Sequence, residues 1–368
     1  MCLSNNTDSA ERLLQELRDR DVRLWREADR LCYRAPSGIL TPALLDRIRS
    51  LKPDMLALLE HHARNASAAN PCPPNIVLLH AGPGKRRVFC IHAVDGGVAP
   101  FLQLSRELAP EATTYGLSVV DLVDRTPLPE SIRAIAGYYA EQVLKVQEHG
   151  PYVLLGWSSG SWIAFEIACE LSRRGCEVGG VIVLDIGAPP RGYDMQLPKG
   201  GEQLGLTPSQ DRSARLWWRF LSLYNTHQVV VPSLFWTLDD GKKSAWLVEH
   251  RDDPELFSRN CDLLAVRDAD DMRFRFDMVN LQHEAIIRYV PSAYSGPIQV
   301  FVACRDSFTP QERQRRFDMI ATFWRMATTG TVHAEFVSGD HSAPLAQPAV
   351  SRVARSALAL SGARHPAP

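Results

Sequence analysis

The chain lacks a charge excess, a long apolar segment and an obvious targeting segment. Its 368 residues carry a formal net charge of −1, which gives no reason to expect nucleic acid or an anionic membrane as a partner. No apolar run approaches the length of a membrane span, and the N-terminal residues do not resemble a signal peptide. We therefore expect a cytoplasmic protein with neither nucleic acid nor membrane among its partners.

The eight cysteines do not form a metal-binding or redox pattern. None lies in a Cys-x-x-Cys pair or in a Cys/His cluster with zinc-ligand spacing. Cys90, Cys169 and Cys304 lie inside apolar runs, where a thiol behaves as a small hydrophobic group. We expect no metal and no cofactor of the protein's own. The hydrophobic content of 45% is ordinary for a globular protein with one large domain, or with a large and a small one.

Residues 1–62 have the pattern of a small independent unit. Leucines at helical spacing precede two strand-like stretches within residues 22–34, and a leucine-rich segment covers residues 43–62. Pro53 interrupts that segment and predicts two helices in place of one. The unit is therefore predicted as a helix, a hairpin and further helices. Residues 63–75 are rich in small residues and proline without periodicity, which is typical of a linker.

From residue 76 to residue 362, apolar strands alternate with helical segments. The strand-like runs are residues 88–92, 152–155, 181–184, 298–303 and 334–337. Strands that are apolar on both faces predict a mainly parallel α/β sheet with helices on both faces. Residues from about 190 to 296 interrupt this alternation with helical and polar segments. That insertion predicts a large helical lid between two strands.

The pentapeptide Gly156-Trp157-Ser158-Ser159-Gly160 has the pattern of a nucleophile elbow. An apolar strand runs into it and an amphipathic helix starts directly after it, as the geometry of an elbow requires. The two glycines allow a sharp turn and a close approach of strand and helix. Ser158 is therefore the predicted nucleophile, at the positive end of the following helix.

A serine nucleophile needs a histidine base and an acid that orients the imidazole. His341 is the predicted base, because it follows a terminal strand and completes the chain order Ser, Asp, His of α/β hydrolases. Two aspartates fit the acid by position. Asp185 ends the strand after the nucleophile strand, and Asp306 lies just beyond the next core strand. The order of the residues does not decide between them.

Acyl transfer through a tetrahedral intermediate needs backbone N–H donors for the oxyanion. Ser159, the residue after the nucleophile, is expected to supply one of them. The loop of residues 92–97 follows an early strand, and its glycines let the backbone turn an N–H inward. A phosphate-binding loop is the alternative, but the glycine spacing matches neither the dinucleotide-binding motif nor the P-loop.

Together these stretches resemble the type I thioesterase domains that release products from nonribosomal peptide and polyketide synthetases. The resemblance covers residues 76 to about 360. The matching stretches are residues 88–97, 150–158, 183–185 and 338–341. The resemblance implies an α/β-hydrolase fold, Asp185 rather than Asp306 as the acid, and Val94 as the second oxyanion donor. Ala93 departs from the proline that the family usually has there.

Residues 1–62 resemble the TubC-type N-terminal docking domains of the same synthetases, which bind the C-terminal tail of a partner synthetase. The two predicted strands carry four arginines, Arg23, Arg26, Arg30 and Arg34. We hypothesise that this edge accepts an acidic tail of an upstream synthetase subunit through strand addition and charge pairing. The sequence has no motif for a carrier protein, so we expect the substrate to arrive on the phosphopantetheine arm of a partner carrier protein.

Together with Ser158 as the predicted nucleophile, the resemblance implies a thioesterase of natural-product biosynthesis that forms an acyl ester on Ser158 and releases it by hydrolysis or macrocyclisation. Four lid aromatics could shape the acyl pocket or equally pack the lid: Trp217, Trp218, Phe220 and Tyr224. The alternatives are an acyltransferase, a type II editing thioesterase and a noncatalytic docking scaffold with an inactive hydrolase domain. The docking unit disfavours the editing enzyme, and the intact Ser158, Asp185 and His341 disfavour the scaffold.

Overall fold

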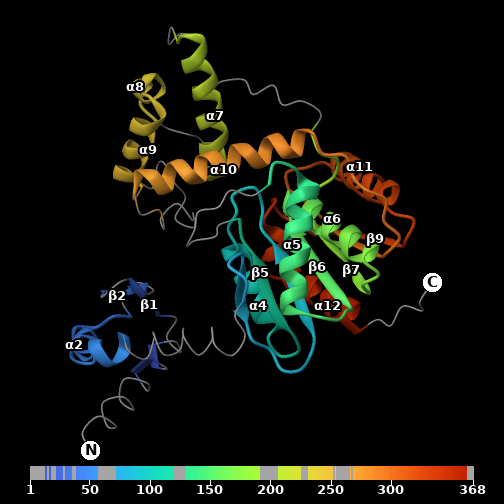
Figure 1. Cartoon of the computed structure of the whole chain (residues 1–368), viewed down its shortest axis with the longest axis horizontal. Helices are drawn as coiled ribbons and strands as arrows, with labels where there is room; N and C mark the ends of the chain where they lie inside the picture. Colours follow the sequence, from blue (N-terminus) through green and yellow to red (C-terminus); the bar gives the residue numbers. More distant parts are fainter. Residues whose placement is uncertain are drawn as a thin grey trace, which may run out of the picture. The chain divides into compact units, whose positions relative to one another are not determined.

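The structure of the chain is a computed structural model (Figure 1). It describes residues 13–14, 16–17, 22–27, 30–34, 39–56, 72–119, 129–190, 206–224, 231–251, 253, 266 and 268–362. The chain divides into two compact units, Met1–Cys72 and Pro73–Pro368. Most of the predicted linker, residues 63–75, lies outside the described residues.

The N-terminal unit contains an antiparallel hairpin followed by helical segments. Strand β1 (Arg23–Glu27) pairs with strand β2 (Arg30–Arg34), and helix α2 (Pro42–Ser50) follows. A break of one residue separates α2 from a second helical stretch at residues 52–56, at the place that Pro53 predicted. The sequence pattern of a hairpin followed by two helices therefore matches the described part of this unit.

A small apolar core holds the N-terminal unit together. Its buried side chains come from the segment before the hairpin and from the helical segments after it: Leu13, Leu14, Leu17, Val22, Leu44, Ile48 and Met55. The side chains of the four hairpin arginines lie outside the part of the chain that the structure describes; they are Arg23, Arg26, Arg30 and Arg34. The predicted docking surface therefore stays a prediction.

The larger unit is built on a seven-stranded sheet with the order β3-β5-β4-β6-β7-β8-β9. Its strands are β3 (Ile76–His80), β4 (Arg87–Ile91), β5 (Thr113–Leu117), β6 (Tyr152–Trp157), β7 (Val178–Leu184), β8 (Ile298–Cys304) and β9 (Val332–Ser338). Strand β3 pairs antiparallel with β5, and the other neighbours are parallel. This arrangement confirms the predicted mainly parallel α/β sheet.

Helices cover both faces of the sheet. They are α4 (Leu102–Leu108), α5 (Ile132–Val146), α6 (Gly160–Arg173), α11 (Pro310–Ala327) and α12 (Ala349–Gly362), with short 3-10 turns η1 (Ala99–Phe101) and η4 (Ala343–Leu345). Leu104 of α4 and Val353 of α12 share one apolar cluster with alternate strand residues. On the other face, α5 and α6 lie side by side (Figure 1), and Phe165 of α6 contacts Trp324 of α11 at a ring-centroid distance of 5.5 Å.

Between β7 and β8 the chain forms a helical insertion with its own apolar core, at the place of the predicted lid, and we refer to it as the lid. The lid helices are α7 (Pro208–Tyr224), α8 (Ser233–Thr237), α9 (Asp240–Glu249) and α10 (Ala269–Ile287). Trp217 of α7 stacks on Phe276 of α10 with ring centroids 3.9 Å apart, and Phe235 and Leu247 are buried around them. Figure 1 shows α7, α8 and α9 at one end of α10, which runs from them to the body of the unit.

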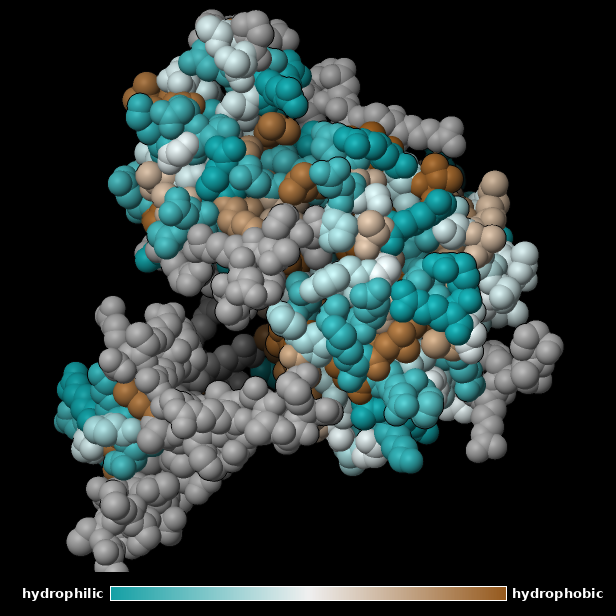
Figure 2. All heavy atoms as spheres, in the orientation of Figure 1, coloured by the Kyte–Doolittle hydropathy of each residue, from teal (hydrophilic) through white to brown (hydrophobic). Residues whose placement is uncertain are grey.

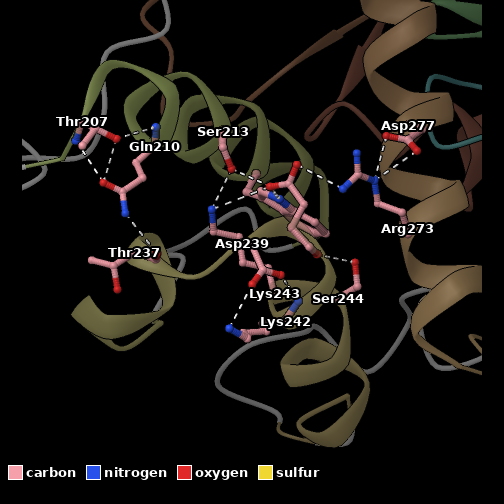
Figure 3. A network of polar contacts seen from close by, with 12 residues as sticks. Thr207, Gln210, Ser213, Thr237, Asp239, Lys242, Lys243, Ser244, Arg273 and Asp277 are labelled. Carbon is pink, nitrogen blue, oxygen red and sulfur yellow. Dashed lines mark hydrogen bonds and ion pairs between the residues drawn. The ribbon is translucent and has the colours of Figure 1, made fainter.

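Figure 3 shows a polar network in the lid in which Ser213, Lys243 and Arg273 take part. All three of these side chains lie close to the carboxylate of Asp240. Its Oδ1 accepts hydrogen bonds from Ser213 Oγ at 2.6 Å and from Trp217 Nε1 at 2.8 Å. Its Oδ2 lies 3.1 Å from Arg273 Nη1. The fully buried Lys243 donates to Ser213 Oγ at 2.7 Å, and burial lowers the pKa of this lysine. Because the charges are paired, the network helps to determine how α7, α9 and α10 meet.

The outer surface carries mixed polar and apolar residues. Figure 2 shows hydrophilic and hydrophobic side chains interspersed over the face in view. Within the part of the chain that the structure describes, no helix has both the length and the apolar character that crossing a membrane requires.

Candidate active site

Ser158 lies at a sharp turn between β6 and α6. Its φ angle is 53°, in the left-handed region that residues other than glycine rarely adopt. The flanking glycines permit this turn, because a Cβ atom on Gly156 would clash with the backbone of Gly160. A Cβ atom on Gly160 would clash with the carbonyl oxygens of Ile91 and His92. The strained serine and the two close approaches are the features of a nucleophile elbow.

Asp185 directly follows β7 and is 2% exposed. Its φ angle is also positive, at 55°. Its Oδ1 accepts hydrogen bonds from the Ala303 amide at 2.8 Å and from Arg316 Nη2 at 2.9 Å. Arg316 Nη2 also lies 2.9 Å from Oδ2, and Arg316 Nε donates to the Ala303 carbonyl at 2.9 Å. These contacts compensate the burial of the carboxylate and fix its orientation.

His341 lies in the loop after β9 and contacts Asp185. The distance from His341 Nδ1 to Asp185 Oδ2 is 2.7 Å. Since a carboxylate can only accept, the proton of the neutral imidazole lies on Nδ1, and Nε2 keeps a lone pair that can accept a proton. Trp157 holds the same loop, because its Nε1 donates to the His341 carbonyl at 2.9 Å. Trp157 precedes Ser158 in the chain, so this contact brings the histidine loop to the elbow.

The alternative acid, Asp306, lies in a different environment. It is exposed in the loop after β8, and its carboxylate accepts a hydrogen bond from Ser338 Oγ. Of the two positional candidates, it is Asp185 that the fold brings to the His341 imidazole.

The loop after β4 carries Val94 and is held by a core histidine. His92 is fully buried, and its Nε2 lies 2.8 Å from the Tyr139 hydroxyl. Its Nδ1 lies 2.6 Å from the Ala93 carbonyl oxygen, which also accepts from the Gly96 amide at 3.0 Å. Burial lowers the pKa of His92 to about 4, which keeps the ring neutral near pH 7. His92 is therefore a structural part of this loop rather than a base.

The two predicted oxyanion donors are the backbone amides of Ser159 and Val94. Ser159 occupies the N-cap position of α6 without a side-chain capping bond, and the helix dipole there favours negative charge. Among the residues that the structure describes, no backbone acceptor takes the amide hydrogen of Ser159 or of Val94. The Val94 side chain packs against the lid core, and its carbonyl oxygen accepts a hydrogen bond from Gln282 Nε2 of α10 at 2.9 Å.

The lid aromatics lie mostly inside the lid. Trp217 and Phe220 are fully buried in its apolar core, with their rings 5.5 Å apart, so they pack the lid and do not form a pocket wall. Trp218 is partly buried against Trp236, at a ring-centroid distance of 6.1 Å. The side chain of Tyr224 lies outside the described residues.

The larger unit has a small cavity at the candidate acid and base and a larger cavity elsewhere. One, of about 180 Å³, lies beside Asp185 and His341 and is also lined by Phe308. The other, of about 560 Å³, is largely apolar and lies between the loop after β7, the end of α10 and the end of α11. Tyr289 lines this second cavity and contacts Trp162, in the first turns of α6, at a ring-centroid distance of 6.2 Å. In the described ranges, no group of three or more His, Cys, Asp or Glu could hold a metal ion.

Three residues of the site region were not predicted from the sequence. Arg316 holds the carboxylate of the candidate acid, Trp157 holds the histidine loop, and Gln282 contacts the loop of Val94. Trp157 could have been suspected from its place next to the nucleophile. Arg316 and Gln282 lie on ordinary amphipathic helices, where an arginine or a glutamine is a common surface residue.

The chain matches two known families. Residues 86–358, most of the chain, match the thioesterase domain family, and the chain belongs to this family. Residues 11–61 match the TubC N-terminal docking domain. Both resemblances predicted from the sequence are thereby confirmed.

The curated relatives of this chain include large synthetases. It is 40% identical over 98 residues to malpibaldin synthetase of Mortierella alpina, covering 27% of this chain and 2% of that protein. It is 32% identical over 107 residues to a dimodular nonribosomal peptide synthase of Bacillus subtilis, covering 29% of this chain and 4% of that protein. The chain thus spans a small fraction of the length of either relative.

A solved four-domain nonribosomal peptide synthetase, with AMP and glycine bound, is similar to this structure. The TM-score is 0.60 at 19% sequence identity, and the match covers 95% of this chain and 25% of that one. At this identity the similarity shows a shared fold and nothing of the substrate.

Proposed function

We propose that this protein is a thioesterase that releases an acyl or peptidyl chain from a partner carrier protein by way of an ester on Ser158. The observation that carries the proposal is the 2.7 Å contact between His341 Nδ1 and Asp185 Oδ2, in a loop that Trp157 ties to the elbow. In this proposal Ser158, His341 and Asp185 act as nucleophile, base and acid.

In the first half-reaction, Ser158 Oγ attacks the carbonyl carbon of the carrier thioester while its proton passes to His341 Nε2. The negative charge that develops on the carbonyl oxygen is stabilised by the amides of Ser159 and Val94. The C–S bond then breaks, and the phosphopantetheine thiolate leaves with the proton from His341. Asp185 stays ionised throughout and stabilises the imidazolium that forms between these steps.

In the second half-reaction, a nucleophile opens the ester on Ser158. Water gives a free acid, and a hydroxyl or amine of the same chain gives a macrocycle. His341 takes the proton of the attacking group and returns it to Ser158 Oγ as the C–O bond breaks. The protein needs no cofactor for this chemistry, since the phosphopantetheine arm belongs to the substrate.

The docking unit supports delivery of the substrate by another protein. A TubC-type docking domain at residues 11–61 gives the chain a means to tether a partner synthetase, and tethering raises the local concentration of a carrier. The sequence places four arginines on the hairpin strands; they are Arg23, Arg26, Arg30 and Arg34. We propose that they bind an acidic C-terminal tail of an upstream synthetase. Reversal of two of these charges should weaken binding of that tail, and unchanged binding would refute the proposed surface.

Two experiments on the full chain test the catalytic proposal. A fluorophosphonate probe should label Ser158, as located by peptide mass mapping, and the Ser158→Ala variant should not react. Incubation with a panel of acyl and peptidyl N-acetylcysteamine thioesters should release thiol, and the product mass separates hydrolysis from cyclisation by the mass of one water. No label at Ser158 would favour a docking scaffold, whereas a product joined to an added alcohol or amine would indicate an acyltransferase. Selective turnover of short, misprimed acyl groups would indicate an editing enzyme.

A further inference from the structure

The loop that presents the Val94 amide is held at two consecutive peptide planes. In a planar trans peptide, the carbonyl of one residue and the N–H of the next point in opposite directions. The Ala93 carbonyl is fixed toward the core by His92 Nδ1 at 2.6 Å and by the Gly96 amide at 3.0 Å. The Val94 N–H must therefore point away from these partners. The contacts of the Ala93 carbonyl with His92 and Gly96 therefore set the direction of the Val94 N–H.

The peptide plane after Val94 is held by a residue of the lid. The carbonyl oxygen of Val94 accepts a hydrogen bond from Gln282 Nε2 at 2.9 Å. Gln282 is 2% exposed, and the Val94 side chain packs on the apolar core of the lid. Both dihedral angles of Val94 are thus constrained, one side of the residue by the body and the other by α10.

Helix α10 connects the lid core to the body of the unit. Its N-terminal half carries Phe276 into the lid core. Beyond its C-terminal end, the buried carboxylate of Glu166 on α6 accepts hydrogen bonds from the Tyr289 hydroxyl at 2.9 Å and from Ser292 Oγ at 2.7 Å. Gln282 lies about two helical turns before Tyr289. Helix α10 runs from the lid helices to the body of the unit (Figure 1), so the contact of Gln282 with the loop depends on how α10 is seated.

We propose that Gln282 is a positioning residue for the oxyanion hole, so that the hole is complete only when α10 is seated on the body. The inference rests on the proposed thioesterase function. A donor that waits in place for the developing charge lowers the barrier without reorganisation, and a loose donor does not. Loss of the Gln282 hydrogen bond frees the peptide plane after Val94. The loop backbone that carries the Val94 amide then keeps only its contacts to the core, and the position of the donor is less well fixed. Displacement of the lid would have the same effect.

The test compares Gln282→Met with the wild-type full chain. The substrate is octanoyl-N-acetylcysteamine. An alkyl boronic acid forms a charged tetrahedral adduct with the serine and so requires the oxyanion hole. The amide analogue of the substrate, with NH in place of sulfur, binds without forming an oxyanion. Leu281→Ala, at a half-exposed position of the same helix, is the matched control.

Gln282→Met should lower kcat and weaken the boronic acid roughly tenfold, with the KM, the affinity for the amide analogue and the thermal midpoint near wild type. Leu281→Ala should match the wild type in all of these. The inference is overturned if Gln282→Met keeps wild-type kcat and boronic acid affinity. It is also overturned if kcat, amide affinity and thermal midpoint fall together, because that pattern marks a purely structural role.

A second variant covers the case in which Gln282→Met does not fold. Gln282→Asn keeps the amide but withdraws the donor by one methylene, and the same readings apply to it. Labelling of wild-type Ser158 by the fluorophosphonate separates the two proposals. Labelled wild type with an unaffected Gln282 variant refutes the positioning role alone, whereas an unlabelled wild type refutes the thioesterase function.

Discussion

His341 and Asp185 meet at 2.7 Å although 156 residues separate them in the chain. Asp185 follows β7 and His341 follows β9, and β8 lies between these strands in the sheet. All three strands are parallel and end at the same edge. Two features bring the side chains together across β8. They are the positive φ of Asp185 and the loop after β9, which Trp157 holds. The pair is therefore a product of the sheet topology.

We expect Asp185→Asn to lower kcat roughly 10³- to 10⁴-fold, since an amide in this place can favour the wrong imidazole tautomer. Asp306→Asn is the matched control, because Asp306 contacts Ser338 and lies in an exposed loop. It should retain near wild-type kcat. Steady-state kinetics on a thioester give kcat for both variants, and circular dichroism verifies that they fold. Equal losses in the two variants would contradict the assignment of the acid.

Arg316→Met removes the guanidinium that holds both oxygens of Asp185 and the Ala303 carbonyl. We expect a stability loss of about 2 kcal/mol and a kcat lower by roughly tenfold, because the acid loses its fixed orientation. Arg316→Lys keeps the charge without the planar fork and should be intermediate. Arg315→Met, at an exposed position of the same helix, should change neither quantity. Urea unfolding and kinetics measure both, and an unaltered Arg316→Met would refute the positioning role.

Gly160→Ala tests the close approach of α6 to the loop after β4. A Cβ atom would clash with the carbonyl oxygens of Ile91 and His92, so the elbow must shift. We expect about 1–3 kcal/mol of destabilisation together with a lower kcat. Gly137→Ala in α5 meets nothing within 4 Å and should instead stabilise the protein, by up to about 1 kcal/mol. Similar unfolding free energies for the two variants would show that the approach is not tight.

The strands in the middle of the sheet could be predicted from the sequence because they bury unbroken apolar runs. Strand β6 is an example, with the buried run at residues 152–155. Strands β3 and β5 could not be predicted in this way. The sequence of β5 is Thr-Thr-Tyr-Gly-Leu, and β3 is mostly exposed at the sheet edge. Their strand conformation comes from pairing with each other and with β4, which no local pattern encodes.

The candidate site likewise has a part that the local sequence predicts and a part that depends on the folded structure. The glycines, strand and helix around Ser158 lie within a few residues of one another, so the elbow is visible in the sequence. The choice of Asp185 needed a family resemblance, since spacing alone left two aspartates. Gln282 lies 188 residues from Val94, and Arg316 lies 131 residues from Asp185. Contacts at such separations depend on the folded arrangement, and neither residue type nor spacing identifies them.

Trp217→Ala should destabilise the protein by about 3–5 kcal/mol, because the side chain is fully buried among the lid helices. Its Nε1 also donates to Asp240, which would lose a partner. Trp218→Ala, at a partly buried position, should cost less. Thermal unfolding compares the two variants. If Trp217→Ala kept wild-type stability but changed the preferred acyl chain, Trp217 would line the acyl pocket instead of packing the lid.

Acid should destabilise the protein through His92. Burial lowers the pKa of this histidine from its ordinary value of 6.5 to about 4. As the pH falls, the unfolded chain therefore takes up the proton before the folded protein does. The stability from the neutral ring is complete above pH 6.5 and declines as the pH falls toward 4, by about 3 kcal/mol for this residue.

His92→Leu should lose that part of the acid sensitivity while its stability at pH 7 falls, because the contacts to Tyr139 and the Ala93 carbonyl disappear. His80→Leu, at an exposed position, is the control for the loss of a histidine that is not buried. Urea unfolding at pH 7 and at pH 4.5 gives the difference for each protein. If His92→Leu and wild type lost equal free energy over this interval, His92 would titrate in the folded protein as it does in the unfolded chain, contrary to its burial.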